Sequence, residues 1–268
     1  MLNPFRFLLG LFCCFVYNAS YCQNKNSRVS ESFETEGFLV NWAASEKCCD
    51  YSLMRSDSVA KTGRYALRVE LRRDDKVIAR GKRAELRLFA EKTPNVERWY
   101  KVSYFLPNDY KSDSMYEILA QWHEMPDRIL GEDWRSPPLS LLTQDGKWKF
   151  RILWATDPVN TNRTISGTKM LDLGEVQTGR WVEWVFHLHF SHQEDGFLQI
   201  WKDGKQIVDE HGPNYYNDRK GPYFKVGMYK SGWVKTFRKS EVSNRVFFID
   251  DIKVGDETYD LAKMLEKN

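Results

Sequence analysis

Short runs in which apolar and polar residues alternate constrain the fold of this chain more than any other feature. In the segment RYALRVELRR (64–73), apolar residues stand at the odd positions and mostly charged residues at the even ones. Side chains two residues apart in a strand share a face, so this run predicts a strand with one apolar face. Similar runs, separated by turn residues, recur as far as residue 255.

Two Asp-Gly pairs support this interpretation. TQDGKWKF (143–150) and WKDGKQIV (201–208) place Asp-Gly between alternating runs, which is a specific signal for a β-hairpin. Only the final segment, 259–268, resembles a helix, and no repeat or linker divides the chain. We therefore predict an all-β sandwich of two antiparallel sheets in a single domain.

The first 22 residues have the outline of a secretory signal peptide. A basic start at Arg6 precedes an apolar run over residues 7–17, which is too short for a stable membrane anchor. We expect cleavage near Cys22, leaving a mature domain of residues 23–268. This domain is expected to be secreted, either extracellular or periplasmic, without a membrane partner.

The net charge limits the kinds of binding partner that we expect, and the cysteine content limits the disulfide bonds. Removal of Arg6 with the signal lowers the formal net charge from +3 to +2, so affinity for a polyanion must come from local placement of charge, and we expect no nucleic-acid partner. Cys48 and Cys49 are the only cysteines beyond the signal. They are free, joined as a vicinal pair, or bonded to another molecule, and the fold does not depend on a disulfide framework. We expect a monomer.

Three predicted strands carry polar side chains on one face. Their residues are Arg83, Glu85 and Arg87; Gln121 and His123; and, in GPYFKVGMYKSGW (221–233), Tyr223, Lys225, Tyr229, Ser231 and Trp233. Gly227 is expected to leave a gap beside the two tyrosines. Such a face is unsuited to a dry core and suits the floor of a groove for a polar, anionic ligand. The alternative is a solvated edge strand with cross-strand ion pairs.

These segments resemble motifs of polysaccharide lyases. KRAELR, QWH and YFKVGMY are similar to the Arg-Ser/Thr-Glu-Leu-Arg, Gln-Ile/Val-His and Tyr-Phe-Lys-Ala-Gly-x-Tyr motifs of family 7 alginate lyases. Together with DGFLQIWKDGK and FIDDIKVGD, the segment 221–233 resembles the heparin lyase I and glucuronan lyase group even more. The resemblance spans about residues 33–255 and implies a concanavalin-like β-jelly roll with a groove on its concave sheet. Ala84, Trp122 and Ser231 depart from the alginate lyase motifs, which affects the expected sugar specificity.

The resemblance implies a lyase that cleaves a uronate polymer of the glucuronan, alginate or heparin type by β-elimination. Arg83 and Gln121, with His123 as a third donor, would neutralise the uronate carboxylate as negative charge develops. Tyr229 would transfer protons if Lys225 and Arg83 lower its pKa, and His123 would be the base if H5 and O4 lie on opposite sides of the ring. Tyr223 is the second candidate for the catalytic phenol.

The remaining expectations concern binding residues and cofactors. The expected substrate-binding residues are Lys225, Tyr223, Glu85, Arg87, Trp122 and Trp233, and the loop arginines Arg128, Arg135 and Arg163 are further candidates. No organic cofactor is expected, because the substrate's own carboxylate is the electron sink.

Three other sites and functions remain open on the sequence. Asp250, Asp251 and Glu34 could hold a structural calcium ion. The segment HLHFSH, with His187, His189 and His192, lacks a further zinc ligand at a familiar spacing. The alternative function is that of a lectin-like, non-catalytic jelly roll that binds sugars on exposed tryptophans.

Overall fold

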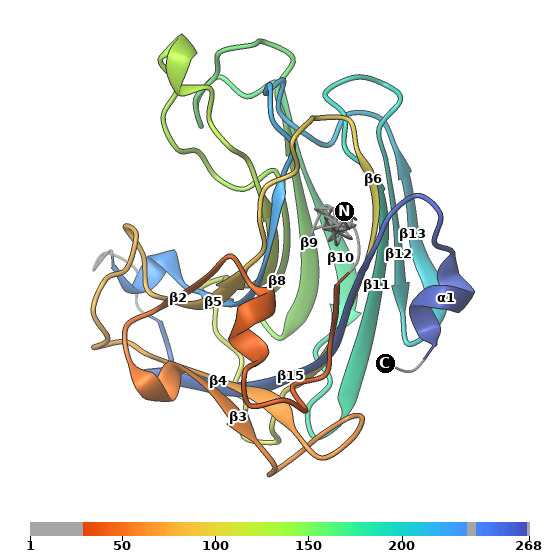
Figure 1. Ribbon diagram of the computed structural model, residues 1–268. Coiled ribbons are helices and arrows are strands. Elements are labelled where there is room, and N and C mark those ends of the chain that lie inside the picture. Colours follow the sequence, from red (N-terminus) through yellow and green to blue (C-terminus); the bar gives the residue numbers. More distant parts are fainter. Residues whose placement is uncertain (1–28, 235–239, 267–268) are drawn as a thin grey trace, which may run out of the picture.

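Two antiparallel sheets lie face to face in the computed structural model of this protein, which describes residues 29–234 and 240–266 (Figure 1). The predicted signal peptide, residues 1–22, lies outside the described residues. The two sheets enclose one large apolar core. The predicted fold class, an all-β jelly-roll sandwich, is confirmed.

The first sheet has eight strands, of which seven form one continuous order and the eighth pairs with the long C-terminal strand. In spatial order the strands are β13 (Lys205–His211), β12 (Phe197–Lys202), β11 (Trp181–His189), β6 (Glu97–Phe105), β15 (Asn244–Gly255), β4 (Ala66–Arg72) and β3 (Leu53–Ser56), with β1 (Val29–Glu31) beside β15.

The second sheet has seven strands and carries the predicted polar motifs. In spatial order they are β10 (Gly167–Glu175), β9 (Lys147–Trp154), β8 (Leu139–Gln144), β7 (Glu117–His123), β14 (Tyr223–Tyr229), β5 (Arg83–Arg87) and β2 (Ala44–Lys47). The three motif-bearing strands β7, β14 and β5 are direct neighbours, although about 100 residues of sequence separate the second from the third motif.

Helical structure is sparse. The described residues include the 3₁₀ helices η1 (Phe38–Asn41), η2 (Asp50–Ser52), η3 (Arg128–Leu130) and η4 (Ser231–Trp233), and the α-helix α1 (Leu261–Leu265). The Asp260 side chain caps α1 by accepting the N–H of Lys263. The helix predicted at the C-terminus is thus confirmed in shorter form. Across the described ranges, no helix has the length and apolar character needed to cross a bilayer.

Both predicted Asp-Gly hairpins are present. Asp145 and Gly146 connect β8 to β9 with φ values of 53° and 76°, and Asp203 and Gly204 connect β12 to β13 with 50° and 77°. Positive φ at both central residues is the requirement of the tight two-residue hairpin turn, which explains why these turns use glycine at the second position.

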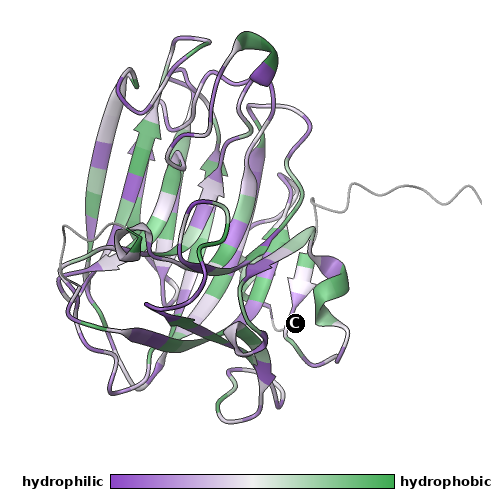
Figure 2. Cartoon of the chain, turned by 90° about the vertical axis from the view of Figure 1, so that its left-hand side faces the viewer, coloured by the Kyte–Doolittle hydropathy of each residue, from purple (hydrophilic) through white to green (hydrophobic). Residues whose placement is uncertain are grey.

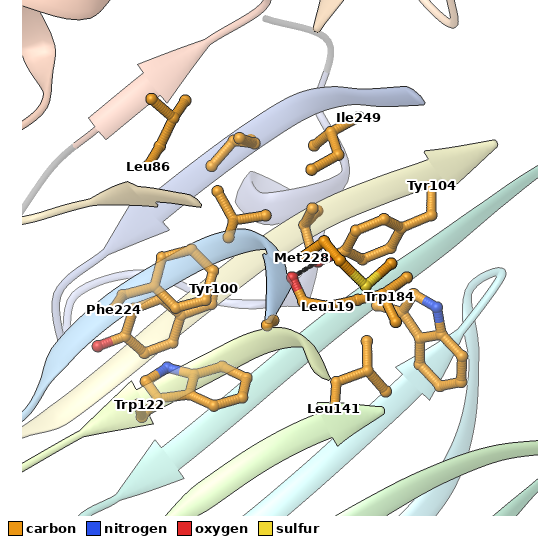
Figure 3. Packing of buried hydrophobic residues seen from close by; sticks show 14 of the residues in the cluster. Leu86, Tyr100, Tyr104, Leu119, Trp122, Leu141, Trp184, Phe224, Met228 and Ile249 are labelled. Carbon is orange, nitrogen blue, oxygen red and sulfur yellow. Dashed lines mark hydrogen bonds between the residues drawn. The ribbon is translucent and has the colours of Figure 1, made fainter. Parts of the chain in front are cut away.

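The alternating pattern of each strand divides it between the core and the opposite face of its sheet. On β14, Phe224, Val226 and Met228 enter the core, where Figure 3 shows Phe224 and Met228 among the packed side chains. The same alternation is visible as bands of opposite hydropathy along the strands in Figure 2. We call the face of the seven-stranded sheet that points away from this core the polar face.

Candidate active site

The polar face brings the three predicted motifs together. Across the strand pairs, Tyr229 lies opposite Arg83, and Lys225 lies between Arg87 and Gln121. Further along β14, Tyr223 lies opposite His123. The predicted common face of β5, β7 and β14 is therefore confirmed.

Tyr229 lies against the Arg83 guanidinium, whose central carbon is 4.5 Å from the centre of the phenol ring. Gly81 packs on the ring, where an added Cβ would lie 2.1 Å from a ring carbon, so no larger residue fits there. Burial raises the pKa of Tyr229 above its ordinary value of 10.0, and the opposing effect of Arg83 is smaller. The shift is opposite to the predicted lowering of the Tyr229 pKa, and burial therefore favours the neutral phenol.

Glu46 on the edge strand β2 binds three cations of this site and was not anticipated from the sequence. Its carboxylate lies 2.9 Å from Arg83 Nη1, 2.7 Å from Lys225 Nζ and 3.3 Å from Arg87 Nε. Burial alone would raise the pKa of Glu46, but the ion pairs with Lys225 and Arg83 lower it. Lys225 is thus occupied by a carboxylate and does not act on the Tyr229 phenol as predicted. The short strand ASEK shows no alternation that could have pointed to Glu46.

Glu85 has a supporting role rather than the predicted contact with substrate. It is 2% exposed and accepts hydrogen bonds from Gln121 Nε2 and, at 3.3 Å, from Arg83 Nη1. Lys225 Nζ lies 3.6 Å away. Because one carboxylate contacts all three groups, Glu85 fixes the orientation of the Gln121 amide and the Arg83 guanidinium.

His123 lies on β7 two residues beyond Gln121, opposite Tyr223 on β14. Its ring stacks on Tyr223 with centroids 5.3 Å apart and meets the edge of Trp134 at 5.6 Å. Its Nδ1 atom lies 2.6 Å from a carboxylate oxygen of Glu124, although the pair lacks the alignment of a hydrogen bond. Tyr223 is only 5% exposed, and burial raises its pKa strongly, so Tyr229 is the better candidate for the catalytic phenol.

The predicted substrate-binding tryptophans are wrong. Trp122 is fully buried between the sheets, where Figure 3 shows it beside Phe224 and Tyr100, because it points opposite to its neighbours on β7. Trp233 is 8% exposed and belongs to the same core, because the chain leaves β14 and turns into η4 before reaching it. Alternation along a strand does not extend past its end.

Gly227 does not leave a gap beside the tyrosines. Its φ is 139°, and an added Cβ would lie 2.1 Å from the carbonyl oxygen of Ala84 on β5. The pairing of β14 with β7 shifts register at this point, between Val226 and Tyr229. Glycine is therefore required here by the backbone of a β-bulge, which sets the position of Tyr229.

The three carboxylates predicted to share a calcium ion have other partners. Asp250 and Glu34 accept backbone N–H groups of the turn 61–65, and Asp251 lies 2.8 Å from Lys101 Nζ. In the part of the chain that the structure describes, these three side chains do not gather around one point. The geometry therefore does not support this calcium site.

The structure also shows the contacts of other residues that the sequence analysis had considered for disulfide, metal or substrate binding. Cys48 and Cys49 form a vicinal disulfide bond, one of the three predicted states. His187 stacks on Trp99 and contacts Glu97, as a structural histidine does. Arg135, considered for substrate binding, is buried.

The polar face continues onto β8 and β9, where sequence analysis had found nothing. Gln121 lies opposite Ser140, and Ser140 lies opposite Arg151. Arg151 donates to the Ser140 hydroxyl at 3.3 Å and lies 5.7 Å from the ring of Tyr116. Since neighbouring strands are 4.7–4.9 Å apart, about 10 Å separates the backbone of Gln121 from that of Arg151.

Comparison with known proteins agrees with these features. A jelly roll with a row of cations, an amide, an imidazole and a phenol on one sheet is an arrangement that suits a carbohydrate-active protein. The model of the family described as Polysaccharide lyase matches residues 26–253, so the chain belongs to that family and is a polysaccharide lyase. No curated protein sequence matches the chain significantly.

Several solved structures share the fold. An endo-β-1,4-glucuronan lyase from the fungus Trichoderma reesei superposes with a TM-score of 0.72 at 18% identity, over 87% of this chain and 97% of that one. A PL-14 alginate lyase from Aplysia kurodai gives 0.54 at 14% identity, over 86% and 98%. An alginate lyase of polysaccharide lyase family 7 gives 0.51 at 14% identity, over 75% and 84%.

Proposed function

We propose that this polysaccharide lyase is secreted and cleaves a glucuronate-containing anionic polysaccharide by β-elimination, with Tyr229 as the proton-transferring phenol. The observation that carries this assignment is the neutral Tyr229 phenol beside Arg83, on the same sheet face as Gln121 and His123. The structural likeness to a glucuronan lyase supports glucuronate over other uronates.

The reaction removes H5 of the uronate and breaks the C4–O4 bond, leaving a C4=C5 double bond on one product. An ionised carboxylate at C5 resists this step because negative charge develops on it. Arg83 and the Gln121 amide, held by Glu85, are preorganised to stabilise that charge. Because the Glu46 and Glu85 carboxylates already offset these cations, the gain comes from fixed geometry more than from net charge.

Tyr229 gives its phenolic proton to O4 as the leaving group departs, because its raised pKa keeps it protonated. The base depends on the sugar epimer. In glucuronate H5 and O4 share a side, so Tyr229 first releases its own proton to solvent, takes H5 as the phenolate beside Arg83, and returns that proton to O4. If they are opposed, His123 takes H5. Tyr229 pairs with Ile118, five residues before His123 on β7, which is about 16 Å between backbones at 3.3 Å per residue, so both side chains must extend toward each other along the face to reach one sugar ring.

The test is to incubate the mature protein with glucuronan, polymannuronate, polyguluronate, heparin, hyaluronan and ulvan, with and without calcium. Ultraviolet absorbance of the unsaturated uronide, which only elimination produces, is the measurement. We expect the largest rise with glucuronan. Binding to these polymers without any rise in absorbance would contradict the proposal and favour the lectin-like function. A requirement for calcium would place an ion elsewhere than among Glu34, Asp250 and Asp251.

A further inference from the structure

The Nδ1 atom of His123 faces only acceptors. It lies 2.6 Å from Glu124 Oε2 and 3.3 Å from the Glu124 carbonyl oxygen. A carboxylate at neutral pH and a carbonyl cannot donate a hydrogen bond, so Nδ1 must carry the proton of the neutral ring. The Nε2 atom is then the unprotonated nitrogen, and the structure gives it no partner among the described residues.

Glu124 is held in place from behind. It is fully buried, and its Oε1 accepts the backbone N–H of Arg135 at 3.0 Å. The Arg135 guanidinium is fixed in turn by both carboxylate oxygens of Asp218 at 2.8 Å, and by Glu132 and Asn160 at 2.7 Å each. These contacts fix the Oε1 side of the Glu124 carboxylate, while Oε2, the oxygen nearest His123, has no hydrogen-bond partner among the described residues.

The His123 ring is restrained on its other sides as well. Tyr223 stacks on one face with an interplanar angle of 10°, and Trp134 meets it edge-on at 77°. Trp134 and Arg135 are neighbours at the end of the loop that begins at Glu124. One loop therefore supplies the carboxylate, the aromatic edge and the arginine that together fix the imidazole.

We propose that Glu124 is a positioning residue that holds His123 in the tautomer with Nε2 free, aimed at the polar face as an acceptor for the substrate. This inference rests on the β-elimination of the proposed function, in the route where His123 takes H5, and adds to it Glu124, the residue that follows His123 in sequence. Glu124 never contacts the substrate. It acts by deciding which ring nitrogen can accept a proton, as the aspartate of a catalytic triad does for its histidine.

The substitution that tests this is Glu124→Gln. The amide can keep the acceptor for the Arg135 N–H while presenting an NH₂ group to Nδ1, which would move the ring proton to Nε2. With a polymer for which His123 is the base, kcat should fall about 10²- to 10⁴-fold with KM nearly unchanged, as expected when a base is held in the wrong tautomer.

Glu132→Gln is the matched control, because Glu132 binds the same arginine but does not contact His123. It should lower the thermal midpoint without moving the ring proton. Equal losses of kcat in Glu124→Gln and Glu132→Gln, at equal thermal midpoints, would show a merely structural role and overturn the proposal.

Nitrogen NMR of ¹⁵N-histidine-labelled protein reports the tautomer of His123 independently of enzymatic activity. The chain has five histidines, and the difference from His123→Gln identifies the signals of His123. We expect unprotonated Nε2 in the wild type and protonated Nε2 in Glu124→Gln. Protonated Nε2 in the wild type overturns the proposal. If no polymer is cleaved, the proposed function fails while this measurement still reports on the Glu124–His123 contact.

Discussion

The two halves of the polar face treat positive charge differently. On β5 and β14, three cations share the carboxylates of Glu46 and Glu85. On β9, Arg151 is close to the Ser140 hydroxyl and the Tyr116 ring, and in the ranges 29–234 and 240–266 no carboxylate lies within ion-pair distance of it.

This difference separates catalysis from attraction. Cations fixed by buried carboxylates are preorganised for charge that develops in the transition state, but their net field on a distant polyanion is small. An arginine without a counter-ion adds to ground-state attraction and to its dependence on salt. Changes at β5 and β14 should therefore act mainly on kcat, and changes at Arg151 on KM.

The largest effect is expected for Tyr229→Phe, which removes one hydroxyl from the half of the polar face formed by β5 and β14. Turnover should fall about 10²- to 10⁴-fold, the usual contribution of a positioned acid or base, while polymer binding and the thermal midpoint stay near wild type. Tyr65→Phe, which removes a phenol beside the eight-stranded sheet, is the control and should be neutral. Retention of most activity by Tyr229→Phe would transfer the role to Tyr223.

The pH profile tests the state of Tyr229 directly. Burial raises the pKa of Tyr229 above 10.0, so the acid form persists through neutral and moderately alkaline pH. If Tyr229 acts only as acid, kcat/KM should stay level to about pH 10 and then fall about tenfold per pH unit. On glucuronate, where the phenolate is the base, kcat/KM should instead climb toward pH 10, and a level profile there would contradict the single-phenol route.

Glu46→Gln should make the cations on β5 and β14 resemble Arg151, which has no carboxylate within ion-pair distance among the described residues. Removal of the shared carboxylate leaves Arg83, Lys225 and Arg87 with more net charge and less fixed geometry. We expect kcat to fall about tenfold and KM to fall as well, as for a charge network that loses one member. In Glu183→Gln, a control that removes the carboxylate paired with Lys61 on the other sheet, neither constant should change.

The smallest effect is expected for Arg151→Gln. KM should rise about three- to fivefold with kcat nearly constant, the range for a partly exposed charge, and the rise should shrink in high salt. Lys147→Gln is matched to it, since Lys147 lies on the same face of β9 but is paired with Asp172 at 2.7 Å. Similar changes in both variants would mean that Arg151 has no special role.

Sequence reasoning predicted the fold and the location of the site because both depend on alternation and on turn chemistry. The strands, the two Asp-Gly hairpins and the set of polar residues that shares a face within each motif follow from spacing inside single segments. The motif resemblance implied a common groove, but the pairing of β5, β14 and β7 is seen only in the structure, since contacts so distant in sequence leave no local pattern.

The errors have physical causes of the same kind. Trp233 was assigned by extending alternation beyond the end of β14, and Trp122 by its residue type rather than its parity. Glu46 and Arg151 were missed because each belongs to a long-range contact and neither lies in a recognisable spacing. Glu124 was missed because its contact with the adjacent His123 depends on the path of the chain after β7. The pKa of Tyr229 could not be predicted, because burial, which raises it, is a property of the folded protein alone.

The most direct test of the central claim, β-elimination on the polar face, is mass spectrometry of the fragments that the mature protein releases from glucuronan. The account predicts that each cleavage yields one fragment with an unsaturated uronide end, lighter by one water than its hydrolytic counterpart, and that Tyr229→Phe yields almost none. Fragments with only saturated ends of hydrolytic mass, or equal yields of unsaturated ends from wild type and Tyr229→Phe, would contradict it.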